Sequence, residues 1–150
     1  MDIMRKRKTT NVDKLYKTFI SIDHGEEKPL SKTFFVSLVE QESIIFLFTK
    51  DRPRGYLIAR SLGDEIEILF LFIDISFRRK GLGKKLLCEL KTLAFRNNIL
   101  KIILEVSFLN KKAISLYEKT GFSELAVRKK YYVCKDKKVD AKLMYFKIDG

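Results

Sequence analysis

The chain has 150 residues, of which 46% are hydrophobic and 33% are charged, a composition typical of a single globular domain with its own core. No apolar stretch reaches the length of a membrane span, so we expect no membrane partner. The formal net charge of +12 favours anionic partners such as RNA, the surface of a ribosome or a polyphosphate cofactor.

The first half of the sequence combines short strand and helix patterns. Ile3 to Lys8 predicts a first strand, and Asn11 is placed to cap a helix that we expect to end at His24-Gly25. Ser31 opens a second helix, whose apolar residues are expected on one face: Phe34, Phe35, Leu38 and Val39. Three β-rich runs follow, 43–49, 56–61 and 65–75, and the last is apolar almost throughout, as in a sheet covered on both faces.

The second half predicts a βαβ unit followed by a helix and a strand pair. Leu82 to Phe95 has helical periodicity and precedes a strand from Leu100 to Ser107, so this strand should run parallel to the 65–75 strand. Asn110 starts another helix, and two final strands should follow, 122–128 and 141–148, joined through a polar segment from Cys134 to Asp140. The pattern predicts an α/β fold with a mixed sheet of six or seven strands flanked by about four helices.

The turn between the 65–75 strand and the next helix has the sequence Arg78-Arg79-Lys80-Gly81-Leu82-Gly83-Lys84. Helix N-termini expose unpaired N–H groups, and glycines let a phosphate approach them closely. The turn therefore indicates a diphosphate site, although a basic turn that merely starts a helix is an alternative. Its spacing matches neither a Walker loop nor the three-glycine dinucleotide fingerprint.

A second motif lies downstream: Leu104-Glu105-Val106, then Asn110, Ala113, Leu116-Tyr117-Glu118 and Gly121-Phe122. Together with Arg78-x-x-Gly81-x-Gly83, it resembles the GNAT family of acyl-CoA-dependent N-acyltransferases. Within that family the chain looks most like the bacterial ribosomal-protein alanine N-acetyltransferases, and the basic run Arg128-Lys129-Lys130 before Tyr131-Tyr132 also fits them. This resemblance implies one GNAT domain over residues 1–150, with the central parallel strands splayed at the cofactor site.

The resemblance also implies acetyl-CoA as cosubstrate and no metal. Its pantetheine arm would pair with the backbone of the first splayed strand, and its diphosphate would lie on the N–H groups of the glycine turn. The implied cofactor-binding residues are Leu71, Phe72, Ile73, Arg78, Arg79, Lys80, Gly81, Leu82, Gly83, Lys84 and Asn110. The sequence itself contains no His, Cys, Asp and Glu cluster with metal-ligand spacing.

Three side chains receive roles in the reaction from the resemblance. Glu105 would be the general base, acting through water, and Tyr117 the general acid that protonates the departing thiolate. Tyr131 would line the substrate groove. Each residue also has a structural alternative: a strand glutamate that meets water, a core tyrosine and an aromatic at a strand edge.

The expected reaction is direct acetyl transfer in a ternary complex, preferably to a protein N-terminal α-amine, with a ribosomal protein as one candidate. Alternatives are a small-amine or lysine acetyltransferase and a basic RNA- or ribosome-binding module with a vestigial cofactor site; without a nucleic-acid motif, RNA contact is expected only through general charge. Two positions depart from the family pattern, since Leu30 and Lys130 stand where an aromatic residue and an asparagine are usual. They leave the acceptor peptide open.

The expected location is the cytoplasm. Cys88 and Cys134 have neither metal nor redox spacing, which favours inert thiols in a reducing compartment. The first ten residues are basic but no apolar stretch follows them, so the sequence predicts no secretory signal.

Overall fold

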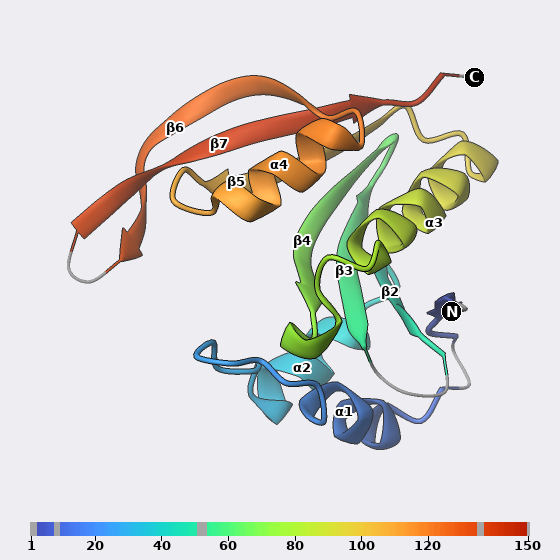
Figure 1. Cartoon of the computed structure of the whole chain (residues 1–150). Helices are drawn as coiled ribbons and strands as arrows, with labels where there is room; N and C mark the ends of the chain where they lie inside the picture. Colours follow the sequence, from blue (N-terminus) through green and yellow to red (C-terminus); the bar gives the residue numbers. More distant parts are fainter. Residues whose placement is uncertain (1–2, 8–9, 51–53, 135–136, 150) are drawn as a thin grey trace.

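The computed structural model describes residues 3–7, 10–50, 54–134 and 137–149, with side chains at all of these except 4, 130–134 and 137–138. Seven strands form one sheet in the order β1-β2-β3-β4-β5-β7-β6, and only the central pair β4–β5 is parallel (Figure 1). This confirms the predicted mixed α/β sheet and its parallel central strands.

The elements follow the predicted order along the chain. No helix in the described ranges is long and apolar enough to cross a membrane. The bounds are β1 (Ile3–Arg5), α1 (Val12–Ile20), α2 (Lys32–Val39), β2 (Ile44–Thr49), β3 (Gly55–Leu62), β4 (Glu65–Ile73), the 3-10 turn η1 (Ile75–Phe77), α3 (Leu82–Arg96), β5 (Lys101–Ser107), α4 (Lys111–Lys119), β6 (Ser123–Cys134) and β7 (Lys137–Lys147).

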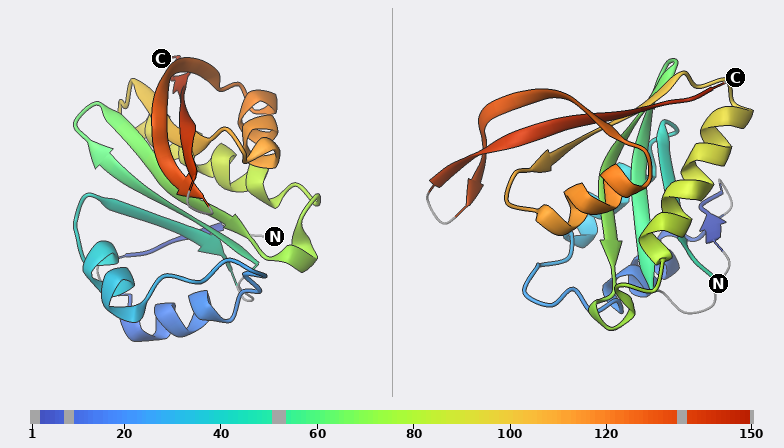
Figure 2. Two further views of the ribbon diagram at one scale, coloured as in Figure 1. Left: turned by 90° about the vertical axis from the view of Figure 1, so that its left-hand side faces the viewer. Right: turned by 45° about the horizontal axis from the view of Figure 1, so that its top comes forward.

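Helices cover both faces of the sheet, with α1 and α2 on one face and α3 and α4 on the other (Figure 2). On the α3 face the core is mainly aliphatic, and Leu86, Leu90 and Ile102 are completely buried there. On the α1–α2 face it is rich in aromatic rings, and the centroids of Phe19 and Phe35 lie 4.9 Å apart. Because β4 is covered on both faces, its sequence is apolar almost throughout.

The first helix ends at Ile20, so the predicted end at His24-Gly25 is wrong. The N–H of Asp23 donates to Oδ2 of Asp74 at 3.1 Å, and the N–H of Gly25 donates to Oδ1 of Asp23 at 2.9 Å. The first bond attaches the chain after α1 to Asp74, directly after β4, and the second closes a local turn, so a further helical turn would break both.

The 65–75 strand ends at Ile73, two residues earlier than predicted. The buried carboxylate of Asp74 accepts a hydrogen bond from the N–H of Ser76 at 2.9 Å, which turns the chain into η1. Asp74 therefore fixes both the end of β4 and the loop after α1.

The last two strands are longer than predicted. The register continues through Tyr132–Val139 and Val133–Lys138 to Cys134–Lys137, so the expected polar connection from Cys134 to Asp140 is mostly strand. Residues 135 and 136 lie outside the described part of the chain. The β6–β7 pair extends as an arm beyond the rest of the sheet (Figure 1).

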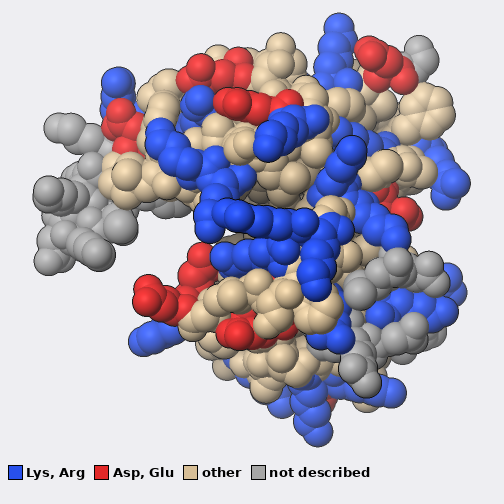
Figure 3. Space-filling view, in the orientation of Figure 1, with Lys and Arg blue, Asp and Glu red and all other residues tan. Residues whose placement is uncertain are grey.

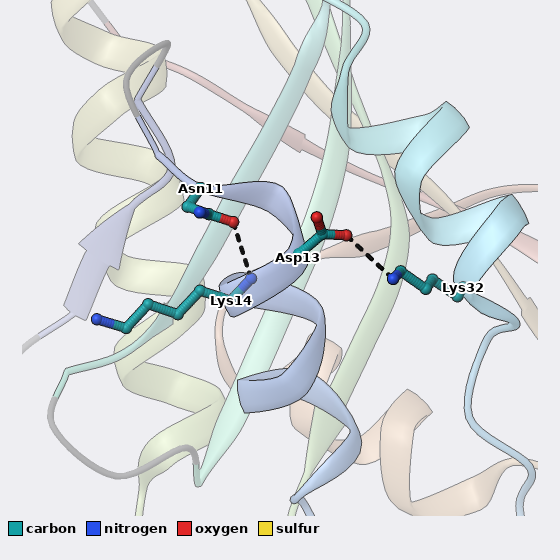
Figure 4. A network of polar contacts seen from close by, with 4 residues as sticks. All are labelled: Asn11, Asp13, Lys14 and Lys32. Atoms are coloured by element: carbon teal, nitrogen blue, oxygen red, sulfur yellow. Dashed lines mark hydrogen bonds and ion pairs between the residues drawn. The ribbon is translucent and has the colours of Figure 1, made fainter.

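Polar contacts join the N-termini of α1 and α2 (Figure 4). Asn11 caps α1 as predicted, and its Oδ1 accepts from the N–H of Lys14 at 3.1 Å. Asp13 and Lys32 form an ion pair of 3.1 Å between the two helices. Both charged side chains are largely exposed, so the pair contributes little stability, about 0–1 kcal/mol, and the aromatic core holds the helices in place.

Candidate functional site

The site is built around the point where β4 and β5 separate. Their parallel ladder ends at the pair Ile68–Leu104, although β4 continues to Ile73 and β5 to Ser107. Among the described residues, no ladder pair joins the two strands beyond that point. The edge of β4 after Ile68 therefore presents backbone polar groups that can accept a ligand as an added strand.

A β-bulge on the other side of β4 coincides with this separation. The register with β3 passes from Ile58–Phe70 to Ala59–Ile68, so that Leu69 is the extra residue. Bulges bend a strand and increase its twist. Because the extra residue directly follows Ile68, β4 turns away from β5 at the place where their ladder ends. The predicted splay of the central strands is thereby confirmed.

The N-terminus of α3 lies next to the end of β4. Gly81 is the N-cap residue with φ +81°, a left-handed conformation, and a Cβ there would meet no atom within 4 Å. Gly83 is buried, and a Cβ there would lie 2.8 Å from Cδ2 of Leu116. Gly81 therefore shapes the turn, whereas Gly83 lets α3 pack closely on α4.

Exposed cations surround this turn. Arg79, Lys80 and Lys84 are exposed, and Lys80 and Arg54 lie 4.9 Å and 3.7 Å from the centroid of the Phe77 ring. Figure 3 shows lysines and arginines gathered in a band across this face of the molecule. The α3 N-terminus and these cations together form an electropositive surface suited to phosphate groups.

Arg78 differs from its neighbours because it is bound to the end of the strand. Its Nε donates to the carbonyl oxygen of Ile73 at 3.1 Å, and its guanidinium lies 5.2 Å from the centroid of the Phe72 ring. This side chain therefore fixes the last residue of β4, a role that the sequence pattern does not indicate.

Glu105 is the first residue of β5 beyond the parallel ladder. Its Oε1 accepts a hydrogen bond from Nη1 of Arg128 on β6 at 2.9 Å, within an ion pair. The Glu105 side chain is 24% exposed, and that of Arg128 is 49% exposed. The sequence did not predict this partner, because the contact between β5 and β6 depends on the strand order of the sheet.

Glu105 lines a cleft of about 320 Å³ beside α2. The lining also includes Arg60 and Glu67, which face each other across β3 and β4. Phe34 lines the cleft together with Leu38 of the same helix and is 47% exposed, whereas Leu38 is buried. Sequence reasoning missed Arg60 and Glu67 as cleft residues; the polar interruption of an apolar strand by Glu67 is the signal that could have found it.

Tyr117 lies on the opposite face of the sheet from this cleft. It is buried in the α3-side core, and its ring packs edge-on against Phe122 with the centroids 5.5 Å apart. The preceding residue, Leu116, is the one that contacts Gly83. Glu105 and Tyr117 thus belong to successive elements but reach the splayed strands from different sides.

The remaining predicted site residues have the following positions. Asn110 caps α4, since its Oδ1 accepts from the N–H of Ala113 at 3.2 Å, and its cofactor contact stays a prediction. The carbonyl of Leu30 accepts from the hydroxyl of Tyr16 at 3.2 Å. The side chains of Lys130 and Tyr131 lie outside the described ones. Within the described chain, no group of three or more His, Cys, Asp or Glu residues could hold a metal ion.

Comparisons with known proteins agree on one family. Residues 10–122 match the Acetyltransferase (GNAT) family. The chain is 34% identical over 113 residues to the ribosomal protein bS18-alanine N-acetyltransferase of Salmonella typhimurium, covering 75% of this chain and 76% of that protein.

Solved structures show the same likeness. The crystal structure of a ribosomal-protein-alanine N-acetyltransferase from Escherichia coli superposes with a TM-score of 0.79 at 26% identity, over 99% of this chain and 96% of that chain. Arabidopsis thaliana NAA60 in complex with acetyl-CoA superposes with a TM-score of 0.75 at 17% identity, over 99% and 100% of the two chains, and shares the fold.

The left-handed turn at Gly81 makes a testable prediction. Gly81→Ala should lower the free energy of unfolding by about 1–2 kcal/mol, the cost of placing a Cβ in this conformation. It should also weaken binding of acetyl-CoA, the expected cosubstrate, because relieving the strain moves the N–H groups of the turn. Urea unfolding and isothermal titration measure the two effects.

Gly63 provides a matched control for this variant. It is also left-handed, with φ +68° and no atom within 4 Å of a built Cβ, but it lies in the turn between β3 and β4. Gly63→Ala should lose similar stability and keep normal affinity. Equal affinity losses in the two variants would contradict a specific role for the Gly81 turn.

Proposed function

We propose, on the premise that this chain belongs to the GNAT acetyltransferase family, that it acetylates the N-terminal α-amine of a protein. The chain is an acetyl-CoA-dependent N-acetyltransferase. The observation that carries the proposed acceptor and mechanism is the separation of β4 from β5, with Glu105 at the first position beyond their ladder and a cleft beside it.

The residues at the separation fit acetyl-CoA. The edge of β4 from Leu71 to Ile73 offers backbone groups for the amides of the pantetheine arm, and Arg78 fixes the end of that edge. The turn from Arg79 to Lys84 offers helix N–H groups and cations for the diphosphate. Asn110, at the start of α4, is the remaining proposed contact. The bound cosubstrate supplies a thioester carbonyl that an amine can attack.

Two side chains manage the protons of the proposed reaction. Glu105 takes a proton from the acceptor ammonium, through water, and so frees the nitrogen lone pair. Tyr117 gives its hydroxyl proton to the sulfur as the carbon–sulfur bond breaks and the carbon–nitrogen bond forms. Because base and acid approach the splayed strands from opposite faces, both can act in one ternary complex and no covalent acyl-enzyme is needed.

An α-amine suits this chemistry better than a lysine. An α-amino group has a pKa of about 8 and a lysine about 10.4, so deprotonation at neutral pH costs roughly 3 kcal/mol less. The related enzyme from Salmonella typhimurium is named for the alanine of a ribosomal protein, which supports an alanine-initiated ribosomal protein as the acceptor. Tyr131 is proposed to line the peptide's path.

A small amine or a lysine is the second candidate acceptor. The cleft holds two carboxylates, Glu67 and Glu105, which could attract an acceptor with two positive charges. Arg60 faces Glu67 in the strand register and Arg128 pairs with Glu105, so each carboxylate has a cation beside it. This charge balance favours the monocationic end of a peptide.

We also propose one N-acetyltransferase domain over residues 1–150 and a cytoplasmic location. The single sheet supports the proposal of one domain, because the cores on its two faces are built from the same strands. A ribosomal acceptor and the need for acetyl-CoA support the cytoplasmic location. Contact with RNA would rest only on the general positive charge.

An acceptor screen tests the proposed function. An alanine-initiated peptide should be acetylated at its α-amine faster than an N-blocked peptide with one lysine or a diamine such as spermidine, with the modified position read by mass spectrometry. If the lysine peptide or the diamine reacts faster, the proposed acceptor is wrong.

The two proposed catalytic groups should respond differently to pH. Glu105→Gln should slow transfer most below about pH 8, where the α-amine is largely protonated, and regain activity at higher pH. Tyr117→Phe should lower kcat by about 10²–10⁴-fold at every pH, since a positioned acid is lost. Pre-steady-state and steady-state pH–rate profiles with one alanine-initiated peptide measure both.

Ring packing is kept in Tyr117→Phe, so its thermal unfolding should match that of the unmodified chain. Near-normal kcat in this variant would mean that Tyr117 only packs in the core. A pH-independent loss in Glu105→Gln would place the base elsewhere.

A further inference from the structure

We propose that Arg128 holds the place of the acceptor's ammonium group on Glu105 and is displaced when the acceptor binds. This inference rests on the proposed function, because it concerns the same carboxylate. It assigns Arg128 as a positioning residue for acceptor binding, acting through Glu105.

The ion pair is a long-range contact that the sheet makes possible. Glu105 and Arg128 are on β5 and β6, and β7 lies between these strands. In the register Glu105 faces Leu143 and Arg128 faces Ala141, so all four side chains lie on the same face of the sheet. The small, fully buried Ala141 leaves room for the arginine side chain to extend across β7.

Other basic side chains of the arm have different partners. Lys129 pairs with Asp140 at 3.5 Å, and Lys142 lies 4.0 Å from Glu118. Nearby cations on β6 and β7 therefore point to other carboxylates, whereas Arg128 pairs with Glu105 at 2.9 Å. The contact is thus a directed one within the described side chains and does not follow from the chain's general positive charge.

The pair lies where the acceptor amine must arrive. Glu105 lines the α2-side cleft, and a base for the amine has to come within hydrogen-bond reach of it, directly or through one water. An ammonium ion and a guanidinium ion carry the same charge, so they compete for the carboxylate. Since the Arg128 side chain is 49% exposed, water can solvate it when it leaves.

This competition between the acceptor and Arg128 ends when the reaction is complete. Acetylation converts the cationic amine into a neutral amide, which no longer competes with Arg128. The guanidinium can then return to Glu105 while the product is still bound, so it does not change the affinity for the product. Arg128 should therefore weaken binding of the substrate peptide but not of the acetylated peptide, and a merely structural residue would not distinguish the two.

The other charged groups of the cleft do not replace this function. Glu67 adds negative charge, and Arg60 stands opposite it in the β3–β4 register. From α2 and the residues after it, the lining consists of Phe34, Ser37, Leu38 and Gln41, all uncharged. Arg128 thus contacts the carboxylate assigned to the amine, and the α2 side of the cleft lining is uncharged.

Peptide binding to Arg128→Gln tests the proposal. With the protein saturated by CoA, an alanine-initiated peptide should bind roughly two- to fivefold more tightly than to the unmodified protein, the range of a partly exposed ion pair. The N-acetylated form of the same peptide should bind with unchanged affinity. Isothermal titration of both peptides measures the difference, and in steady state it appears as a lower KM.

Three further variants make the outcome decisive. Lys129→Gln removes the same charge from the next residue and should leave both affinities unchanged, and Arg128→Lys should keep the affinities of the unmodified protein. In a Glu105→Gln background, Arg128→Gln should no longer tighten substrate binding, because the shared partner is absent. Thermal unfolding establishes that each variant is folded.

Weaker substrate binding in Arg128→Gln would overturn the proposal and assign Arg128 to direct contact with the peptide. An equal change for both peptides, or a loss of kcat alone, would also overturn it. If the unmodified protein acetylates no peptide α-amine, the proposed function itself fails, which the acceptor screen shows separately from these titrations.

Discussion

The separation of β4 from β5 is the constraint on which the rest of this structure depends. One extra residue, Leu69, bends β4 directly after its last pairing with β5. Without the bulge, the ladder could continue to Leu71, opposite Ser107 at the end of β5, and would satisfy backbone groups that a ligand needs. The same bend sets Glu105 at the opening and not within the ladder. A single insertion in one strand thus creates both the proposed cofactor edge and the place of the proposed base.

The packing of helices preserves this opening. Helix α3 starts beside the end of β4 and connects it to β5, so its N-terminal N–H groups reach the same place as the free edge. Gly83 lets α4 approach through Leu116, and Arg78 and Asp74 fix the chain at the end of the strand. These contacts hold the end of β4 and the start of α3 in place.

Electrostatics divides the opening into two sides. The α3 side carries exposed cations around a helix N-terminus and suits a diphosphate. The α2 side carries carboxylates beside arginines, in a cleft with little net charge, and suits an amine that enters as a cation and leaves as an amide. The proposed function assigns a role to only part of the net charge of +12, the cations of the turn from Arg79 to Lys84.

Local signals predicted much of this arrangement. Caps at Asn11, Ser31 and Asn110 and the apolar period of α3 depend on nearby residues, and they appear as expected. The predicted end of α1 was wrong because Asp74, which is distant in sequence, holds the loop after this helix. The ion pair between Arg128 and Glu105 crosses β7, which follows both residues in the sequence, so no local spacing pattern predicts it. The turn motif was found from the local pattern of glycines and cations, and Glu105 received its role from a family likeness, whereas the partner of Glu105 needed the register of the whole sheet.

Hydrogen exchange at the amides of β4 tests the central claim most directly. Amides between Leu69 and Ile73 that do not bond to β3 should exchange fast in the protein alone and become protected when acetyl-CoA is added. The amides of Leu82 to Lys84 should become protected with them, while β1 and β2 change little. Protection that appears elsewhere and leaves these two segments unchanged would contradict the claim that the separated strands bind the cosubstrate.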